Sequence, residues 1–268
     1  MLTILFLGDV VGEPGRTAVI TRLPELKRKY ALDFIIVNGE NAAAGRGITP
    51  KITIDLLRAG VSVVTSGDHI WDRKEIVPFI ETEPRLLRPL NYPAGTPGAG
   101  AIVLETPKAK IGVINVQART FMQPILENPF PLLDAAVKAM RLETPNIVVD
   151  AHGETTSEKI ALGRYLDGRV SAVLGTHTHV QTADEQIFDQ GTAFICDAGM
   201  CGPVHSILGR AIEPIVGRFI SNMPTPFPVA LGETRLRGVL LEIEETTGKA
   251  RRITRLDEPG SSVEAAPA

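Results

Sequence analysis

Acidic, amide and imidazole side chains recur in the 268-residue chain, each time at or just after the end of a short apolar run. Oxygen and nitrogen donors of this kind can act as metal ligands or as proton donors and acceptors. Four of the five histidines belong to this set, whereas His205 falls outside it and is expected to be a loop residue. In chain order the set is Asp9, Glu40, Asn41, Asp68, His69, His152, His177 and His179.

The chemistry of this set depends on whether its members meet in the folded protein. Clustered carboxylates and imidazoles are costly to bury unless they coordinate metal. Oxygen and nitrogen donors without a thiolate suit manganese, iron or zinc better than calcium or magnesium. The candidate ligands are too many for one tetrahedral zinc, and they suit two ions roughly 3.5–4 Å apart that share a carboxylate. Such a pair activates a bridging hydroxide and stabilises the oxygens of a phosphoryl displacement, so the set predicts phosphoryl chemistry.

The elements that must position these residues are short, β-branched apolar runs that lack clean alternation, which indicates strands covered on both faces. Helical segments alternate with strands in the first third of the chain, and this predicts βαβ units with a parallel sheet. Because ligands bind at the carboxyl edge of such a sheet, the polar residues should converge there. We expect strands over 3–7, 34–37, 61–65, 101–104, 111–116, 147–149, 170–174, 192–196 and 238–243, and helices over 16–30 (kinked or restarted at Pro24), 50–59, 131–143 and 155–167.

Composition limits the class of protein. The chain is 44% hydrophobic and 22% charged, which is ordinary for a globular domain and excludes a disordered one. The net charge of −3 argues against a stable nucleic-acid partner, and no apolar run is long enough for a membrane span. Two cysteines form no disulfide scaffold, so we expect a cytoplasmic protein. We expect a single domain over residues 1–258 and a flexible tail over 259–268.

The ordered blocks resemble those of the calcineurin-like metallophosphoesterases: Gly8-Asp9, Gly39-Glu40-Asn41, Gly67-Asp68-His69, His152 and Gly175-Thr-His177-Thr-His179. Longer strings over 8–12, 38–41, 152–159, 175–184 and 197–203 resemble one branch, the YmdB-type phosphodiesterases. The resemblance extends to about residue 245. It implies a four-layer α-β-β-α sandwich with a dinuclear metal site. It also implies phosphodiester substrates that include 2′,3′-cyclic and 3′,5′-cyclic nucleotides. The sequence leaves open whether the natural substrate is one of these or a larger diester.

Carried over by position, the resemblance implies the ligands of each metal. One ion would bind Asp9, Glu40, Asn41 and His179, and the second would bind Glu40, Asp68, His152 and His177. His69 matches the proton donor to the leaving oxygen, and iron is the first expectation, with manganese or zinc as alternatives. The family usually has Asn where this chain has Asp68. The extra charge should hold metal at least as well and activate the hydroxide less.

Two other classes of function can be compared with this hypothesis. A nucleotide- or phosphate-binding regulatory protein could use residues 8–15 and the following helix N-terminus, but that segment is neither G-x-G-x-x-G nor a P-loop. A serine hydrolase would need a G-x-S-x-G elbow, which is absent from the sequence. Asp72 is expected to orient His69 or pack the loop, Arg46 to be solvated, and Glu154 either to support the site or to begin a helix. A homo-oligomer could form around 84–100 or 223–228.

Overall fold

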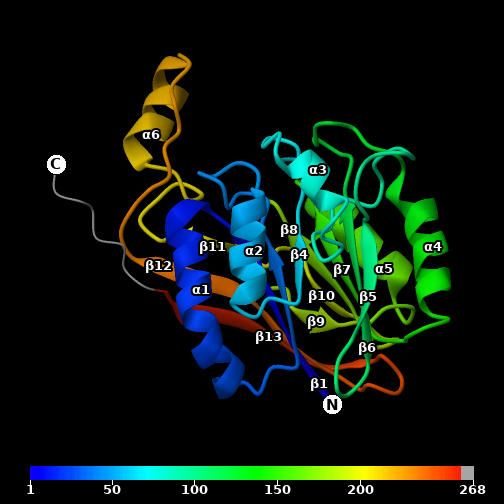
Figure 1. Ribbon diagram of the computed structural model, residues 1–268. Coiled ribbons are helices and arrows are strands. Elements are labelled where there is room, and N and C mark those ends of the chain that lie inside the picture. Colours follow the sequence, from blue (N-terminus) through cyan, green and yellow to red (C-terminus); the bar gives the residue numbers. More distant parts are fainter. Residues whose placement is uncertain (261–268) are drawn as a thin grey trace.

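The computed structural model describes residues 1–260. Two mixed β-sheets pack face to face, and helices cover the outer face of each (Figure 1). Helices α1 (Gly12–Lys29) and α2 (Pro50–Arg58) lie against the first sheet. Helices α4 (Pro129–Met140) and α5 (Thr156–Leu166) lie against the second. The predicted four-layer α-β-β-α sandwich is therefore confirmed.

The first sheet has the strand order β2-β11-β12-β1-β3-β4, with β13 paired to β12. At one side of this sheet β1, β3 and the edge strand β4 run parallel, so their carboxyl ends share one edge. Strand β12 runs antiparallel to β1 and to β13. The bounds are β1 (Leu2–Leu7), β2 (Asp9–Val10), β3 (Phe34–Asn38), β4 (Val63–Thr65), β11 (Met200–Pro203), β12 (Thr234–Ile243) and β13 (Ala250–Pro259).

The second sheet has the order β5-β6-β7-β8-β10-β9. Its four inner strands are parallel, and the two edge strands are antiparallel to their neighbours. Its carboxyl edge faces the same end of the molecule as that of β1, β3 and β4 (Figure 1). The bounds are β5 (Ala101–Glu105), β6 (Lys110–Gln117), β7 (Ile147–His152), β8 (Ala172–Thr176), β9 (Gln186–Ile187) and β10 (Ala193–Ile195).

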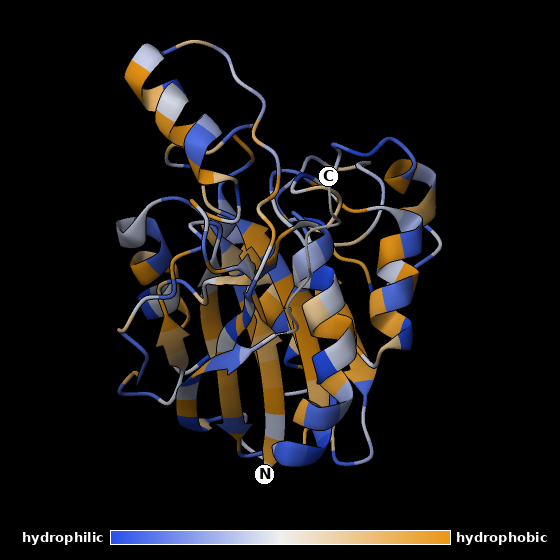
Figure 2. Ribbon diagram, turned by 90° about the vertical axis from the view of Figure 1, so that its left-hand side faces the viewer, coloured by the Kyte–Doolittle hydropathy of each residue, from blue (hydrophilic) through white to orange (hydrophobic). Residues whose placement is uncertain are grey.

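Side-chain alternation along the strands builds three apolar layers. Ile4 and Phe6 of β1 point into the layer between the two sheets, whereas Leu5 and Leu7 point toward α1 and α2. A third layer lies between the second sheet and the helices α4 and α5. Because the central strands are buried on both faces, they are hydrophobic along most of their length (Figure 2). This is why their positions could be predicted.

The helices begin where local sequence signals place them. The Thr49 hydroxyl accepts from the backbone N–H of Ile52 at 3.3 Å, and Pro50 occupies the first turn of α2. Asn128 accepts from the N–H of Phe130 at 3.2 Å at the start of α4. The remaining helices are α3 (Ile76–Ile80) and α6 (Ile212–Ser221). Among the helices of residues 1–260, none is both long and apolar enough to cross a bilayer.

Some expected boundaries are wrong. Helix α1 starts at Gly12 and continues through Pro24, because Leu23 and Leu26 are buried on either side of the proline and tertiary packing holds the helix together. Among the elements that were not predicted are β13, whose edge position leaves several charged side chains exposed, and α6, in which Ile215 is the one buried residue. Pro259 ends β13, and the rest of the expected tail, residues 261–268, lies outside the described residues.

Candidate metal centre

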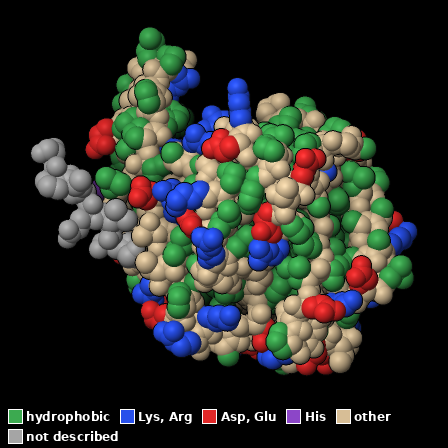
Figure 3. All heavy atoms as spheres, in the orientation of Figure 1, with side chains coloured by type: hydrophobic (Ala, Val, Ile, Leu, Met, Phe, Trp, Pro, Cys, Tyr) green, Lys and Arg blue, Asp and Glu red, His purple; other side chains and the backbone are tan. Residues whose placement is uncertain are grey.

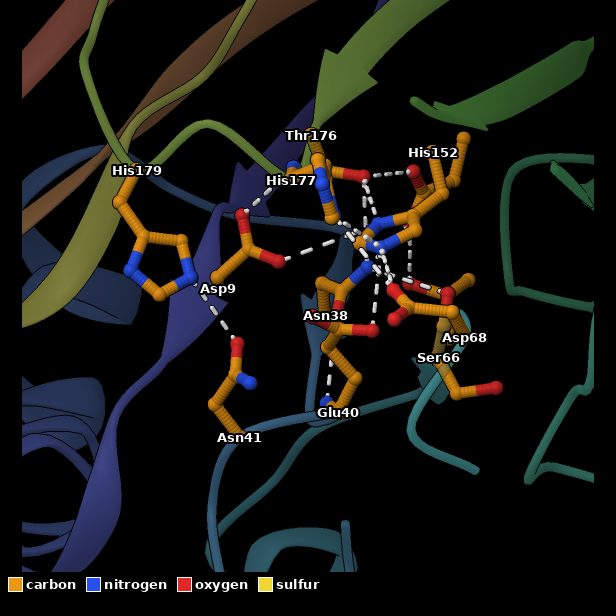
Figure 4. A network of polar contacts seen from close by, with 12 residues as sticks. Asp9, Asn38, Glu40, Asn41, Ser66, Asp68, His152, Thr176, His177 and His179 are labelled. Carbon is orange, nitrogen blue, oxygen red and sulfur yellow. Dashed lines mark hydrogen bonds and ion pairs between the residues drawn. The ribbon is translucent and has the colours of Figure 1, made fainter. Parts of the chain in front are cut away.

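The predicted site residues converge at the shared carboxyl edge of the two sheets (Figure 4). Asp9 lies in β2, Glu40 and Asn41 in the turn after β3, and Asp68 in the turn after β4. The second sheet contributes His152, which is the last residue of β7, and two histidines in the loop after β8, His177 and His179. The residues therefore converge at the carboxyl ends of strands, as predicted, but these strands belong to two sheets and not to one.

Two clusters of potential ligand atoms share one carboxylate. Atoms of Glu40, Asp68, His152 and His177 lie within 4.8 Å of one another, and so do atoms of Asp9, Glu40 and His179. Asn41 adds a further oxygen to the second cluster, since its Oδ1 lies 3.0 Å from Nε2 of His179. The structure thus groups the residues in the same two sets that the family resemblance implies.

The hydrogen bonds of His152 leave its Nε2 facing acceptors. The Thr176 hydroxyl donates to Asp150 at 2.7 Å, so the Nδ1–H of His152 donates to that hydroxyl at 2.8 Å. In the neutral ring Nε2 then carries a lone pair, yet it lies 3.0 Å from Glu40 Oε2 and 3.1 Å from Asp68 Oδ1. Acceptors that face one another need a cation or a proton between them.

His179 shows the same arrangement. Its Nδ1 lies 3.1 Å from the carbonyl oxygen of Leu208 and donates to it, which leaves Nε2 directed at Asn41 Oδ1. The Asn41 amide nitrogen donates to Gly45 O at 3.2 Å, and this turns the amide oxygen toward the histidine. A second pair of acceptors therefore faces each other across a gap that suits a cation.

Two of the candidate ligands are buried carboxylates with an oxygen that lacks a hydrogen-bond donor. Asp9 is fully buried and Glu40 is 1% exposed, and neither Asp9 Oδ1 nor Glu40 Oε2 has a hydrogen-bond donor of good geometry. Burial raises the pKa of Asp9, and burial alone would lower the pKa of His152, but Glu40 and Asp68 raise it well above the usual value. Unpartnered buried carboxylate oxygens are costly, and metal coordination would satisfy them. The residues therefore fit a pair of metal ions.

Gly67 keeps the centre of the site open. A Cβ at this position would collide with Glu40 Oε2 and with Nε2 of His152. Any larger residue would fill the space between these two candidate ligands, so the sequence must have glycine directly before Asp68.

A buried polar network beneath the ligands was not predicted. Asp150 accepts hydrogen bonds from Thr65 at 2.5 Å, Thr176 at 2.7 Å and Asn38 at 3.0 Å. Burial raises the pKa of Asp150 to about 6, although the two hydroxyl hydrogen bonds act in the opposite direction. The network orients His152 through Thr176. The signal in the sequence was a polar residue inside or at the end of each otherwise apolar run.

The loop that carries His177 and His179 is held in an unusual conformation. These residues have backbone φ angles of +103° and +65°, which residues other than glycine rarely adopt. The fully buried Lys159 donates to Thr176 O at 3.3 Å and pairs with Asp197 at 3.0 Å. Asp197 also accepts from the backbone N–H of Thr178 at 3.0 Å. A buried ion pair thus holds this loop at Thr176, directly before it, and at Thr178, between the two histidines.

His69 lies at the mouth of the site, with Asp72 Oδ2 3.2 Å from its Nδ1. Arg46 pairs with the same carboxylate at 2.8 Å, so Asp72 orients the ring, as expected, and Arg46 is not merely solvated. This arrangement leaves Nε2 of His69 free of Asp72. Glu154 precedes α5 rather than beginning it and lies 3.3 Å from Nε2 of His177, so it supports the site.

A cavity of about 430 Å³ opens beside the two clusters. The candidate ligands form one wall, and α6 with its flanking segments forms the other. The cavity is lined by Glu40, Asn41, His69, Glu154, His177, Thr178, His179, Ile207, Leu208, Arg210, Ile215, Arg218, Phe219 and Phe227.

The alternative anion site at the start of α1 has its backbone donors already engaged. The N–H of Gly12 donates to Asn41 O at 2.9 Å, and that of Val11 donates to Cys201 O at 2.9 Å. The N–H of Gly15 donates to Val11 O at 3.2 Å. These donors position β2 and the turn after β3, so they are not free to bind a phosphate.

Comparison with known proteins supports the same family as the motifs. A family model described as "YmdB-like protein" matches residues 5–256. A Bacillus subtilis (strain 168) protein named 2′,3′-cyclic-nucleotide 2′-phosphodiesterase is 50% identical over 255 residues, which cover 95% of this chain and 96% of the relative.

Two crystal structures share the fold over nearly their whole length. One is of a protein from Thermus thermophilus described as hypothetical, with a TM-score of 0.90 at 42% identity, covering 97% of this chain and 100% of the other. The second is of a protein from Mycoplasma pneumoniae described as a novel phosphatase, with a TM-score of 0.91 at 35% identity, covering 97% and 94%. Since the family model and these relatives span almost the entire chain, the protein belongs to the YmdB-like family, within the metallophosphoesterases that its motifs predicted.

Proposed function

We propose that this protein is a dinuclear metal-dependent phosphodiesterase that hydrolyses 2′,3′-cyclic nucleotides at the bond to O2′. The single observation that carries the proposal is the pair of ligand clusters joined by the buried carboxylate of Glu40. The name of the Bacillus subtilis relative supports the choice of substrate. Nucleoside 3′,5′-cyclic phosphates are the second substrate class to be compared.

The metals would be held by the two clusters. Asp9, Glu40, Asn41 and His179 would bind one ion, and Glu40, Asp68, His152 and His177 the other. When bound, two such ions supply positive charge against the phosphoryl oxygens and lower the pKa of a water molecule. The mixed carboxylate and imidazole donors suit iron, which we propose first, with manganese or zinc as alternatives.

His69 would protonate the leaving oxygen. In the reaction a water oxygen forms a new bond to phosphorus, the bond between phosphorus and O2′ breaks, and O2′ leaves with a proton. Asp72 holds His69 by Nδ1 at 3.2 Å, so Nε2 is the nitrogen available to give that proton. The product is a nucleoside 3′-phosphate.

The proposal is tested on purified protein in two steps. Metal analysis should find close to two transition-metal ions per chain, and removal of metal with a chelator should abolish hydrolysis of 2′,3′-cyclic AMP. The His177→Ala variant should lose metal, whereas His205→Ala, which changes an exposed histidine outside the site, should retain it. Absence of bound metal together with chelator-resistant hydrolysis would refute the proposal.

The cellular setting is part of the proposal. Cys196 and Cys201 are both buried and unpaired, which fits the reducing conditions of the cytoplasm. The expected partner is a small phosphodiester and not a stably bound nucleic acid. A homo-oligomer stays a prediction that sedimentation of the metal-loaded protein would test.

A further inference from the structure

A protruding segment forms the second wall of the cavity. Residues 211–228 leave the body of the protein, form α6 and return, and Figure 1 shows this helix projecting beyond both sheets. The two ends of the segment are joined by a hydrogen bond from Ala211 N to Pro228 O at 3.0 Å. We call this protruding segment, residues 211–228, the excursion; its two ends lie side by side where it leaves the body of the protein.

Arg210 fixes this excursion to the metal-ligand side of the cavity. Its guanidinium donates to Phe227 O at 2.9 Å, to Ala44 O at 3.3 Å and to Gly45 O. Ala44 and Gly45 belong to the turn that carries Glu40 and Asn41. The position of the excursion is thus tied directly to the position of two candidate ligands.

The excursion presents a largely apolar wall to the cavity, in which Arg218 is the charged side chain. Ile215, Arg218 and Phe219 are spaced i, i+3 and i+4, so one face of α6 lines the cavity. Ile215 is 7% exposed, whereas Phe219 is 84% and Phe227 41% exposed. Hydrophobic side chains gather on this projection (Figure 3). Two phenyl rings thus line the cavity with much of their surface in contact with solvent, opposite the ligand clusters.

We infer that Phe219 and Phe227 form a subsite for the nucleobase of the substrate. The inference rests on the proposed function, which places the phosphate at the ligand clusters on the other wall of the same cavity. The nucleobase of a nucleotide has an apolar π-face that stacks on aromatic side chains. The phosphate is an anion, and it would bind at the wall where the ligand clusters would hold the metal ions. The cavity of about 430 Å³ is in the size range of a small-molecule site.

The chemistry of the wall also sets its selectivity. Leu208, Ile215 and the two phenyl rings have no side-chain groups that could hydrogen-bond to the edge of a base. Arg218, on the same face of α6, offers donors alone, and each of the four bases has acceptors on its edge. Stacking depends on area, so the subsite should accept all four bases and favour purines over pyrimidines. If the two phenyl rings instead formed a contact surface for a second protein, substrate binding would not depend on the base.

The test compares substrates with and without a base on the metal-loaded enzyme. The Phe219→Ala/Phe227→Ala variant should raise KM for adenosine 2′,3′-cyclic phosphate by roughly tenfold, which is within the range for loss of a base–aromatic stack. KM for methyl riboside 2′,3′-cyclic phosphate, which lacks a base, should not change. Ile220→Ala is the matched control, because Ile220 is 82% exposed on α6 and does not line the cavity.

A binding measurement separates stacking from catalysis. Adenosine 3′-phosphate, titrated calorimetrically, should bind the double variant roughly tenfold more weakly, while inorganic phosphate should bind both proteins equally. Equal losses for substrates with and without a base, or no loss for either, would overturn the inference and leave the proposed function intact. A wild-type enzyme that hydrolyses neither cyclic phosphate would refute the proposed function itself.

Discussion

At the scale of single residues, Asp68 distinguishes this site from the usual family pattern. Burial alone would raise its pKa, but the neighbouring imidazoles of His152 and His177 lower it, so the side chain is a carboxylate. Asp9, Glu40 and Asp68 together place three negative charges beside the proposed ions. An asparagine at position 68 would leave two, and the water held by the metals would then be more acidic.

We therefore expect Asp68→Asn to raise kcat about two- to fivefold at saturating metal, which corresponds to less than about 1 kcal/mol of barrier. Metal affinity should stay equal or fall, because one anionic ligand becomes neutral. The measurement is kcat on 2′,3′-cyclic AMP together with metal content. A loss of both metal and turnover at saturating metal would contradict the electrostatic argument.

His69 gives a second prediction at this scale. His69→Ala should keep both metals and lower kcat by about 10²–10⁴-fold on 2′,3′-cyclic AMP, because the ribose O2′ must leave with a proton. A diester with a p-nitrophenolate leaving group should be affected much less, since that group departs without one. The comparison of the two substrates is the measurement. Equal losses on both would remove His69 from the role of proton donor.

The sequence allowed these ligands to be predicted because each stands at or near the end of an apolar run. It could not show the network beneath them. Thr65 and Thr176 look like ordinary strand residues, and their role depends on Asp150. Strand pairing brings Asp150 beside Thr176, and the packing of the two sheets brings it beside Thr65. Contacts between strands that are distant in the sequence produce no recognisable pattern of residue spacing, so they could not be predicted.

At the scale of elements, the loop after β8 depends on α5. Two residues with positive φ cost about 1–3 kcal/mol each, and such strain persists only where surrounding contacts impose it. Lys159, from α5, and Asp197, after β10, supply those contacts. The motifs over 152–159 and 197–203 thus support the loop after β8, and His152 is the one candidate ligand that they contain.

Lys159→Met should lower the free energy of unfolding by about 3–5 kcal/mol, because it leaves the carboxylate of Asp197 buried without its cation. It should also weaken metal binding, since His177 and His179 lose the support of their loop. Leu162→Ala is the control, because it removes buried packing from the same helix at a similar cost of about 2–5 kcal/mol.

The measurements are denaturant unfolding of the metal-free proteins and metal titration at temperatures where both variants are folded. Lys159→Met should have a metal Kd at least roughly tenfold higher than that of Leu162→Ala. Equal metal affinities in the two variants would show that the ion pair contributes to stability alone.

Elements outside the apolar layers were harder to predict than the strands that carry the candidate ligands. The central strands are buried on both faces, so hydrophobicity alone locates them. Strand β13 has many exposed charged side chains, and α6 contains Pro214 and Gly217 and buries one residue. Neither has the pattern of a core element, and each is held in place by partners distant in the sequence.

At the scale of the whole molecule, the candidate metal centre lies where the two sheets meet. Asp9, Glu40 and Asp68 come from the first sheet, and His152 and His177 from the second. Apolar packing holds the sheets together below, but at this edge the contact consists of carboxylates and imidazoles, of which Asp9, Glu40 and His152 are buried. Without metal, this edge carries mutual repulsion among carboxylates, so bound ions should stabilise the entire fold.

Removal of metal should therefore lower Tm. At a free metal concentration of about a thousand times Kd, one site contributes about 4 kcal/mol to the folded state. The Tm of a chain of this size falls by about 2–4 °C for each kcal/mol of unfolding free energy that is lost. A chelator should therefore lower Tm by roughly 10 °C or more. His205→Ala should keep the full shift, whereas His177→Ala should show a much smaller one. A Tm that does not respond to chelator, in protein shown by analysis to have carried two ions, would mean that the sheets are held together by their apolar layer alone.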